Sequence, residues 1–231
     1  MSTTTVTTDR SATGATGTAA AAAALVDGYL RVHRYLEDTT AALASATAAL
    51  RPDDQVGAAG LQRAWRRLAS AVEHHHRTHH EVVLAHVSGV APDLAEHLEG
   101  LEERDGRLRV RARTVTTSLG WLVSGWRDRR AGTPEAVPAT RALASELRDH
   151  LADEEAVVLP VLLALGDDEA TALAEGIERC HSGAEALPFA LVTGAMSLAD
   201  LPVGLRLAAR AVLLPRYERD LAALTADASE R

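Results

Sequence analysis

The sequence predicts an all-α protein whose main part is an up-and-down four-helix bundle, followed by additional helices at the C-terminal end. Hydrophobic residues make up 47% of the chain and aromatic residues only 3%, with Ala and Leu dominating. This composition favours helices over sheets, because Ala and Leu lose little conformational freedom in a helix. Four long segments also place their large residues three or four positions apart, which is the spacing of one helix face. Short connections between such segments favour antiparallel neighbours.

The composition divides the chain into three parts. Residues 1–19 consist mainly of Ser, Thr, Gly and Ala and predict a disordered tail. Residues 20–166 contain the four periodic segments, and residues 167–231 form an extension that we expect to pack on the bundle. In this extension the periodic pattern is weaker, and three stretches can be helical: 168–181, 184–197 and 203–224.

The first two predicted helices cover residues 20–50 and roughly 58–88. One histidine, His33, lies on the apolar stripe of the first predicted helix. It is either a metal ligand or an ordinary histidine of a helix interface. The second stripe steps strictly by four and three, and two histidines take positions where Leu or Val would be expected. Its members are Leu61, Trp65, Leu68, Val72, His75, His79, Val82 and His86. The neighbouring His74, His76 and His80 lie off this stripe, so we expect them on a solvated face.

The third predicted helix carries one acidic residue, Asp105, among its core positions, and the fourth carries His150 and Glu154 at two consecutive core positions. The Gly- and Pro-containing segment 126–138 between them predicts a loop. With that loop, Asp105 and His150 lie at unequal distances from the connection. Either the third helix extends past its neighbour, or the loop folds back.

Six polar side chains therefore interrupt the apolar stripes. A buried carboxylate without a partner is strongly unfavourable unless its pKa shifts until it is neutral. A divalent cation is a suitable common partner, because imidazole and carboxylate groups bind iron, manganese and zinc. A spacing of four puts both members of a pair on one helix face. The predicted ligands come from all four helices: His33, His75, His79, Asp105, His150 and Glu154. For Asp105 the alternative is an ion pair with Arg104 or Arg109.

At these positions the chain resembles the hemerythrin-like, or HHE cation-binding, domain family. The resemblance covers roughly residues 25–220, and it includes the string DEEAVVLP. Residues 184–219 also resemble the C-terminal extension of actinobacterial members. The family pattern is His on the first helix, His-x3-Glu on the second, His on the third and His-x3-Glu on the fourth. The resemblance implies two irons and a role in binding or reacting with O2, peroxide or NO.

Two positions depart from the family pattern. His79 stands where the family has Glu, and Asp105 stands where it has His. Either the two ligand types have exchanged helices and both metals remain, or the site binds one metal, another metal such as manganese or zinc, or none. The alternative function is a helical metal-binding or interaction module without catalysis. The same ligands would serve a carrier, a sensor or an enzyme, so the sequence predicts neither the reaction nor the oligomeric state.

One acidic and two tyrosine side chains lie near the candidate ligands in the sequence. Glu155 is expected at the surface or behind a metal-bound imidazole. Tyr29 and Tyr35 flank His33 and either pack in the core or donate a hydrogen bond to a bound oxygen species.

Charge and cysteine usage limit the partners and the compartment. The net charge of -8 argues against nucleic acid, because neutralising phosphates requires a basic face. No apolar run approaches the ~20 residues of a membrane span. A single cysteine, Cys180, excludes an internal disulfide framework and predicts a reducing, cytoplasmic compartment.

Overall fold

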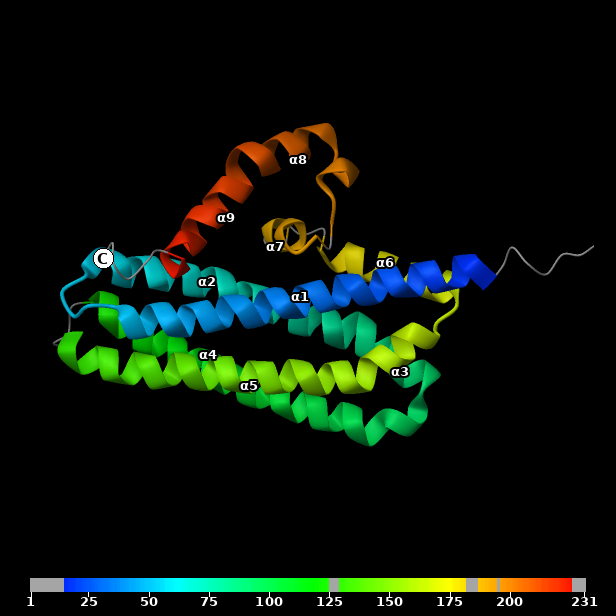
Figure 1. Cartoon of the computed structure of the whole chain (residues 1–231), viewed down its shortest axis with the longest axis horizontal. Coiled ribbons are helices and arrows are strands. Elements are labelled where there is room, and N and C mark those ends of the chain that lie inside the picture. Colours follow the sequence, from blue (N-terminus) through cyan, green and yellow to red (C-terminus); the bar gives the residue numbers. More distant parts are fainter. Residues whose placement is uncertain (1–14, 125–128, 182–186, 195, 226–231) are drawn as a thin grey trace, which may run out of the picture.

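The fold is an antiparallel bundle of four helical columns with a group of shorter helices on one side (Figure 1). It was obtained as a computed structural model that describes residues 15–124, 129–181, 187–194 and 196–225. The predicted all-α class and the bundle with further C-terminal helices are confirmed. The four columns are α1 (Ala15–Ala49), α2 (Gln55–Thr78) continued by a π-helix η1 (His79–Leu84) and α3 (Ala85–Val90), α4 (Ala95–Ser124) and α5 (Arg129–Ala164).

The boundaries of the first columns follow local sequence signals. Pro52 and two aspartates lie between α1 and α2, and Asp54 caps α2 by accepting a 2.7 Å hydrogen bond from the backbone N–H of Gly57. Pro92 opens a short 3-10 turn, η2 (Pro92–Leu94), that leads into α4. At the other end α1 begins at Ala15, earlier than predicted. The remainder of the predicted tail, residues 1–14, lies outside the described residues.

The prediction of a loop over residues 126–138 is wrong for its larger part, because α5 already begins at Arg129. Proline disfavours a helix interior, but burial of the following turn offsets this cost. Ala136 and Thr140 are fully buried, and the Thr140 hydroxyl donates to the Ala136 carbonyl at 3.0 Å. Because α5 is longer than predicted, Asp105 and His150 lie at nearly the same distance from the connection between α4 and α5. Asp105 lies 19 residues before the end of α4, and His150 lies 21 residues after the start of α5.

The interior of the bundle is a polar layer between two apolar clusters. The first cluster, near the α1–α2 connection, includes Leu43, Leu68 and Leu119, and the second, at the opposite end, includes Val87 and Leu162. In every column the candidate ligands fall in the sequence between the bulk of these two clusters. The apolar ends hold the four helices together, and they fix the level of the polar layer.

The π-helix η1 changes the register of the second column. A π turn contains one residue more than an α turn, so the buried face moves on by one position. The predicted stripe continued to Val82 and His86, but the structure buries Val83 and Val87 instead, at 3% and 0% exposure. The stripe predicted up to His79 is therefore confirmed, and its continuation is wrong by one residue.

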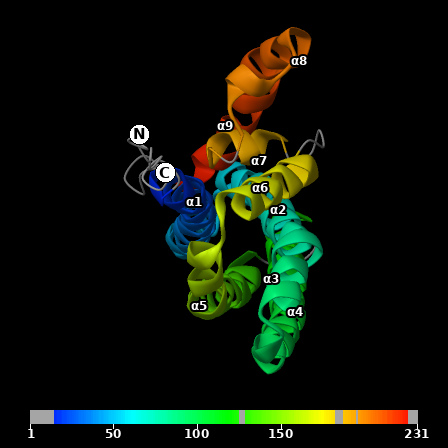
Figure 2. The ribbon, with the colours of Figure 1, turned by 90° about the vertical axis from the view of Figure 1, so that its right-hand side faces the viewer.

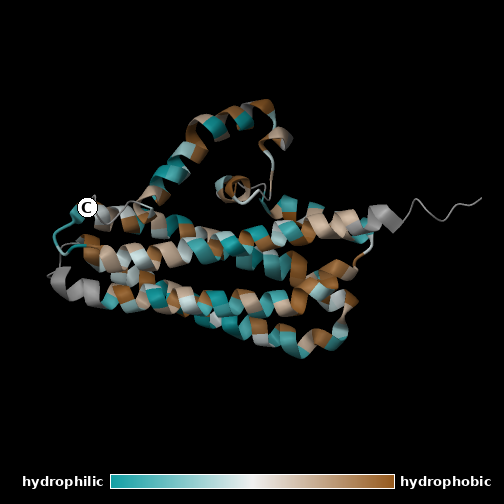
Figure 3. Ribbon diagram, viewed as in Figure 1, coloured by the Kyte–Doolittle hydropathy of each residue, from teal (hydrophilic) through white to brown (hydrophobic). Residues whose placement is uncertain are grey.

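The C-terminal helices all lie on one side of the bundle (Figure 2). Helix α6 packs on α1 and η1, and α9 packs on α2. The elements are α6 (Asp167–His181), α7 (Leu187–Val192), η3 (Leu198–Asp200), α8 (Val203–Ala208), η4 (Ala209–Leu213), α9 (Leu214–Leu221) and η5 (Ala222–Leu224). Helix α8 and the short elements next to it stand away from the bundle (Figure 3). Val203 and Leu207 on α8 are exposed apolar residues. None of the described helices is both long and apolar enough to cross a membrane.

Candidate metal centre

Three helices contribute one buried side chain each to a first cluster around the Glu154 carboxylate. Its Oε2 atom lies 3.3 Å from Nε2 of His33 on α1 and 3.3 Å from Nε2 of His75 on α2. The ligand atoms of these three residues all lie within 4.8 Å of one another. We call His33, His75 and Glu154 triad A.

A second cluster lies beside the first and includes α4. Asp105 Oδ1 lies 2.8 Å from His150 Nε2 and 3.4 Å from His76 Nε2, and the three ligand atoms again lie within 4.8 Å of one another. We call His76, Asp105 and His150 triad B. His150 Nε2 is also 2.7 Å from Glu154 Oε1. The two oxygens of Glu154 thus face the two triads, and this carboxylate lies between them.

His79 lies beside both clusters but belongs to neither triad. Its Nδ1 is 3.3 Å from Glu154 Oε1, and its Nε2 is 3.2 Å from the hydroxyl of Tyr29. Tyr29 can also donate to Glu154 Oε2 at 3.4 Å. Tyr29 therefore lies at the site itself, whereas the hydroxyl of Tyr35 pairs with that of Tyr217 and lies outside it.

The ligand atoms converge without satisfying one another, which is the arrangement that a cation would complete. Several of these buried atoms make no hydrogen bond of good geometry. They are His33 Nε2, His76 Nε2, His79 Nδ1, Asp105 Oδ1, His150 Nε2 and Glu154 Oε1. Unpaired buried polar atoms are rare because each costs about 1–3 kcal/mol. Six of them pointing into one polar layer fit one or two bound divalent ions.

Protonation of the imidazoles agrees with this fit. Burial lowers the pKa of His75, that of His76 to about 4 and that of His79 to about 3, so these rings are neutral at pH 7 and able to bind a metal. Burial alone would also lower the pKa of His150, but the contacts with Asp105 and Glu154 raise it to about 9. In the metal-free protein the His150 proton neutralises part of the carboxylate charge.

Both carboxylates are ionised. Burial raises the pKa of Asp105, but its contacts with His150 and His76 outweigh this effect and lower it to about 2. Burial likewise raises the pKa of Glu154, and His79, His75 and His150 together lower it well below its usual range. Two negative groups in the polar layer give a divalent cation a favourable electrostatic site.

Residues behind the triads fix the orientation of the ligands. Nδ1 of His33 is 2.9 Å from Oε1 of Glu155, so this carboxylate holds the His33 ring with Nε2 directed at triad A. On the other side, His80 Nε2 contacts Asp105 Oδ2 and leaves Oδ1 directed at triad B. Carboxylate–imidazole pairs of this kind raise the basicity of metal-binding rings.

The structure thus brings five of the six predicted residues into the two triads and places His79 next to them. It adds His76, which the sequence reasoning assigned to a solvated face. That assignment is wrong for His74 and His76, which are 4% and 5% exposed, because α6 and α7 cover the first and α4 covers the second. The pairing of Asp105 with an arginine is also wrong. Asp105 contacts three imidazoles, and Arg104 pairs instead with Asp153.

One signal in the sequence could have identified His76. Residues 75 and 76 are neighbours on a wide helix face, and His76 and His80 repeat the i, i+4 spacing of His75 and His79. The strict stripe with alternating steps treats only one residue per turn as buried. In a four-helix bundle each helix packs against two neighbours, so its buried face is wider.

The fold and the polar layer define the class: a four-helix bundle in which every helix presents a histidine or a carboxylate to a buried layer suited to a metal ion. Comparison with known families specifies it further. The hemerythrin HHE cation-binding domain matches residues 24–162, and the chain belongs to this family. The match covers most of the four columns and all members of both triads. The curated proteins and the solved structures to which the chain was compared contain no significant match.

Proposed function

We propose that this protein holds two iron ions in triads A and B and uses them to bind or react with O2, peroxide or NO. The observation that carries the proposal is the convergence of six buried ligand atoms, none in a hydrogen bond of good geometry, on a layer divided by one carboxylate. The first ion would be held by His33, His75 and Glu154, and the second by His76, Asp105 and His150. His79 is a further ligand candidate, because its Nδ1 faces Glu154 Oε1.

When bound, iron with an open coordination position supplies the redox chemistry and the affinity for O2, peroxide or NO. The protein's own groups perform the remaining tasks. Glu154 spans the two triads, and Glu155 orients His33. Burial and the negative charge of Glu154 raise the pKa of Tyr29 well above its usual value, so its hydroxyl keeps the proton and can donate a hydrogen bond. The apolar clusters shield the layer on its two sides along the bundle.

Zinc, manganese or a single ion is the second candidate. The donor set contains more imidazoles than carboxylates, and this favours the alternative because imidazole also suits zinc. In that case the protein would be a metal-binding or interaction module without redox activity. The single Cys180 agrees with a reducing, cytoplasmic compartment under either proposal.

Elemental analysis and an absorption spectrum of the purified protein separate the two. We expect about two irons per chain and an absorption band that changes when the reduced protein meets air, peroxide or NO. Zinc, or no metal, would contradict the proposal.

His150→Ala should remove at least half of the iron. His74→Ala is the matched control, because His74 is also buried but lies outside both triads. Equal losses in the two variants would contradict the ligand assignment.

A further inference from the structure

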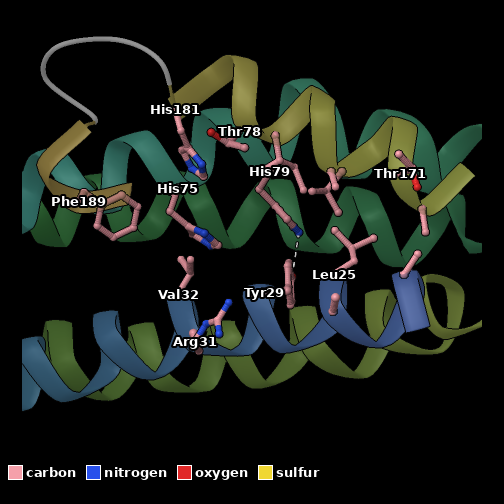
Figure 4. Close-up of a pocket in the computed structure, with 17 residues that line it drawn as sticks. Leu25, Tyr29, Arg31, Val32, His75, Thr78, His79, Thr171, His181 and Phe189 are labelled. Carbon is pink, nitrogen blue, oxygen red and sulfur yellow. Dashed lines mark hydrogen bonds between the residues drawn. The ribbon is translucent and has the colours of Figure 1, made fainter. Parts of the chain in front are cut away.

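Helices α6 and α7 form a half-open cavity of about 340 Å³ against the bundle, directly beside triad A. Figure 4 shows its lining, which comes from α1, from the α2–η1 junction, and from α6 and α7. Its wall at the metal centre is formed by Tyr29, His75 and His79. The cavity therefore connects the space under the C-terminal helices to the candidate ligands.

Most of the lining is apolar. Leu25, Val32, Val83, Ile177 and Phe189 supply the larger side chains. A dry cavity of about 150 Å³ with such walls holds benzene, so this cavity has room for an organic molecule of roughly ten to twelve non-hydrogen atoms.

The charge of the lining indicates a neutral ligand. Arg31 is the one charged side chain among the described residues of the wall, and it is already paired with Asp27 at 2.9 Å. It also contacts the carbonyl of Gly194 at 3.5 Å. An anionic or cationic ligand would therefore lose its hydration without gaining an unpaired counter-charge.

Besides Nδ1 of His79 at the metal centre, two buried polar atoms of residues that line the cavity have no hydrogen-bond partner among the described residues. They are the hydroxyl of Thr78 and Nδ1 of His181, and both residues are more than nine-tenths buried. In Figure 4 the Thr78 hydroxyl lies on the side of His181. Other threonines in the helices of this protein donate to the carbonyl four residues earlier, as Thr40 does to Leu36 and Thr47 to Leu43. Thr78 makes no such bond, so the hydrogen-bonding capacity of its hydroxyl is unused.

We propose that this cavity binds a small, neutral, mainly apolar organic molecule whose hydroxyl or carbonyl group is recognised by Thr78 and His181. The apolar part of the ligand lies along α1 and α6 and reaches Tyr29 and His79, so the molecule is held against triad A. If the bound molecule is a substrate of the metal centre, the inference rests on the proposed function. Binding of the molecule itself depends only on the cavity.

Two nearly isosteric probes test the polar and apolar parts separately. Benzyl alcohol carries the hydroxyl group, and ethylbenzene replaces it by a methyl group. We expect saturable calorimetric binding of both probes to the purified protein, with benzyl alcohol binding about three- to tenfold more tightly because it satisfies the buried polar atoms. Absence of saturable binding of both probes would overturn the proposal.

We expect Gly28→Leu to fill part of the cavity and to keep the fold. Gly28 lines the cavity, and a Cβ added there would meet only the tip of Arg31, at 3.8 Å. Leucine is also a better helix former than glycine. We expect at least tenfold weaker binding of both probes at undiminished thermal stability. Gly120→Leu on α4 is the control, because a side chain there meets open space away from the cavity. Unchanged binding in Gly28→Leu would overturn the proposal.

Thr78→Val tests the recognition of the polar group. We expect benzyl alcohol binding to weaken about three- to tenfold and ethylbenzene binding to change less than twofold. Thr171→Val is the matched control, because Thr171 lines the cavity but is exposed. Equal effects of the two variants would remove Thr78 from the proposal.

Metal content measured in the same samples separates this inference from the proposed function. Binding of the probes to metal-free protein supports the cavity whatever the metal proves to be. Iron-loaded protein that binds neither probe would instead leave the metal centre standing and refute the pocket.

Discussion

Triad A and triad B share α2 and α5 but differ in their access. Triad A meets the cavity through His75, with Tyr29 and His79 beside it. No member of triad B lines that cavity, and His80 covers Asp105 from the far side. Catalytic metal sites keep an open position, whereas structural sites are closed by protein ligands. The comparison therefore suggests two unequal ion positions, with small molecules reaching triad A and triad B serving as the closed partner.

Removing the shared carboxylate should have the largest effect. Glu154→Gln takes a negative charge from the layer between both triads, so we expect both ions to be lost in elemental analysis. Glu146→Gln is the control, because Glu146 lies on the same helix and pairs with Arg111 near the surface, at 2.7 Å. A variant that keeps one full ion would show that Glu154 serves one triad only.

Removing a ligand of triad B should cause about half the loss of bound metal that Glu154→Gln causes. Asp105→Asn weakens only that triad, and we expect the metal content to fall by about one ion per chain while the response to NO remains. Asp153→Asn on the surface of α5 serves for comparison, since Asp153 pairs with Arg104 rather than with the site. Unaltered metal content would make Asp105 an ordinary partner of the imidazoles around it.

Glu155 offers a test confined to triad A. Glu155→Gln replaces the carboxylate behind His33, and second-sphere changes of this type cost about 10- to 100-fold in metal affinity. Chelator competition should show this loss for one of the two ions, with partial recovery in Glu155→Asp. Equal weakening of both ions would argue against two separate positions.

The smallest expected effect concerns the buried imidazoles outside both triads. Burial lowers the pKa of His181 to about 4. Between pH 6.5 and pH 4, His181 is therefore protonated in the unfolded chain but neutral in the folded chain. Stability therefore falls as the pH drops from 6.5 towards 4. For this one group we expect the free energy of unfolding to fall by about 2 kcal/mol between pH 7 and pH 5. Urea unfolding of the wild type and of His181→Leu at the two pH values measures it, and equal pH dependence in both would exclude His181 as the cause.

Prediction from the sequence succeeded where the helical period is uninterrupted. Leu and Ala at steps of three and four predict the columns, and the same steps place His33, Asp105, His150 and Glu154 inside. It failed at the π-helix, where one extra residue moves burial from Val82 to Val83. No local signal predicts such a turn, because its cost is offset by contacts made only after folding.

The sequence by itself determined the fold class, the four columns and the presence of buried acids and imidazoles that require a common partner. Tertiary structure alone decided how those side chains divide into two triads, and that His76 rather than His79 completes the second. The physical reason is that a period describes one helix face, whereas a coordination site depends on distances between helices. Those distances follow from the packing of the two apolar clusters on either side of the polar layer.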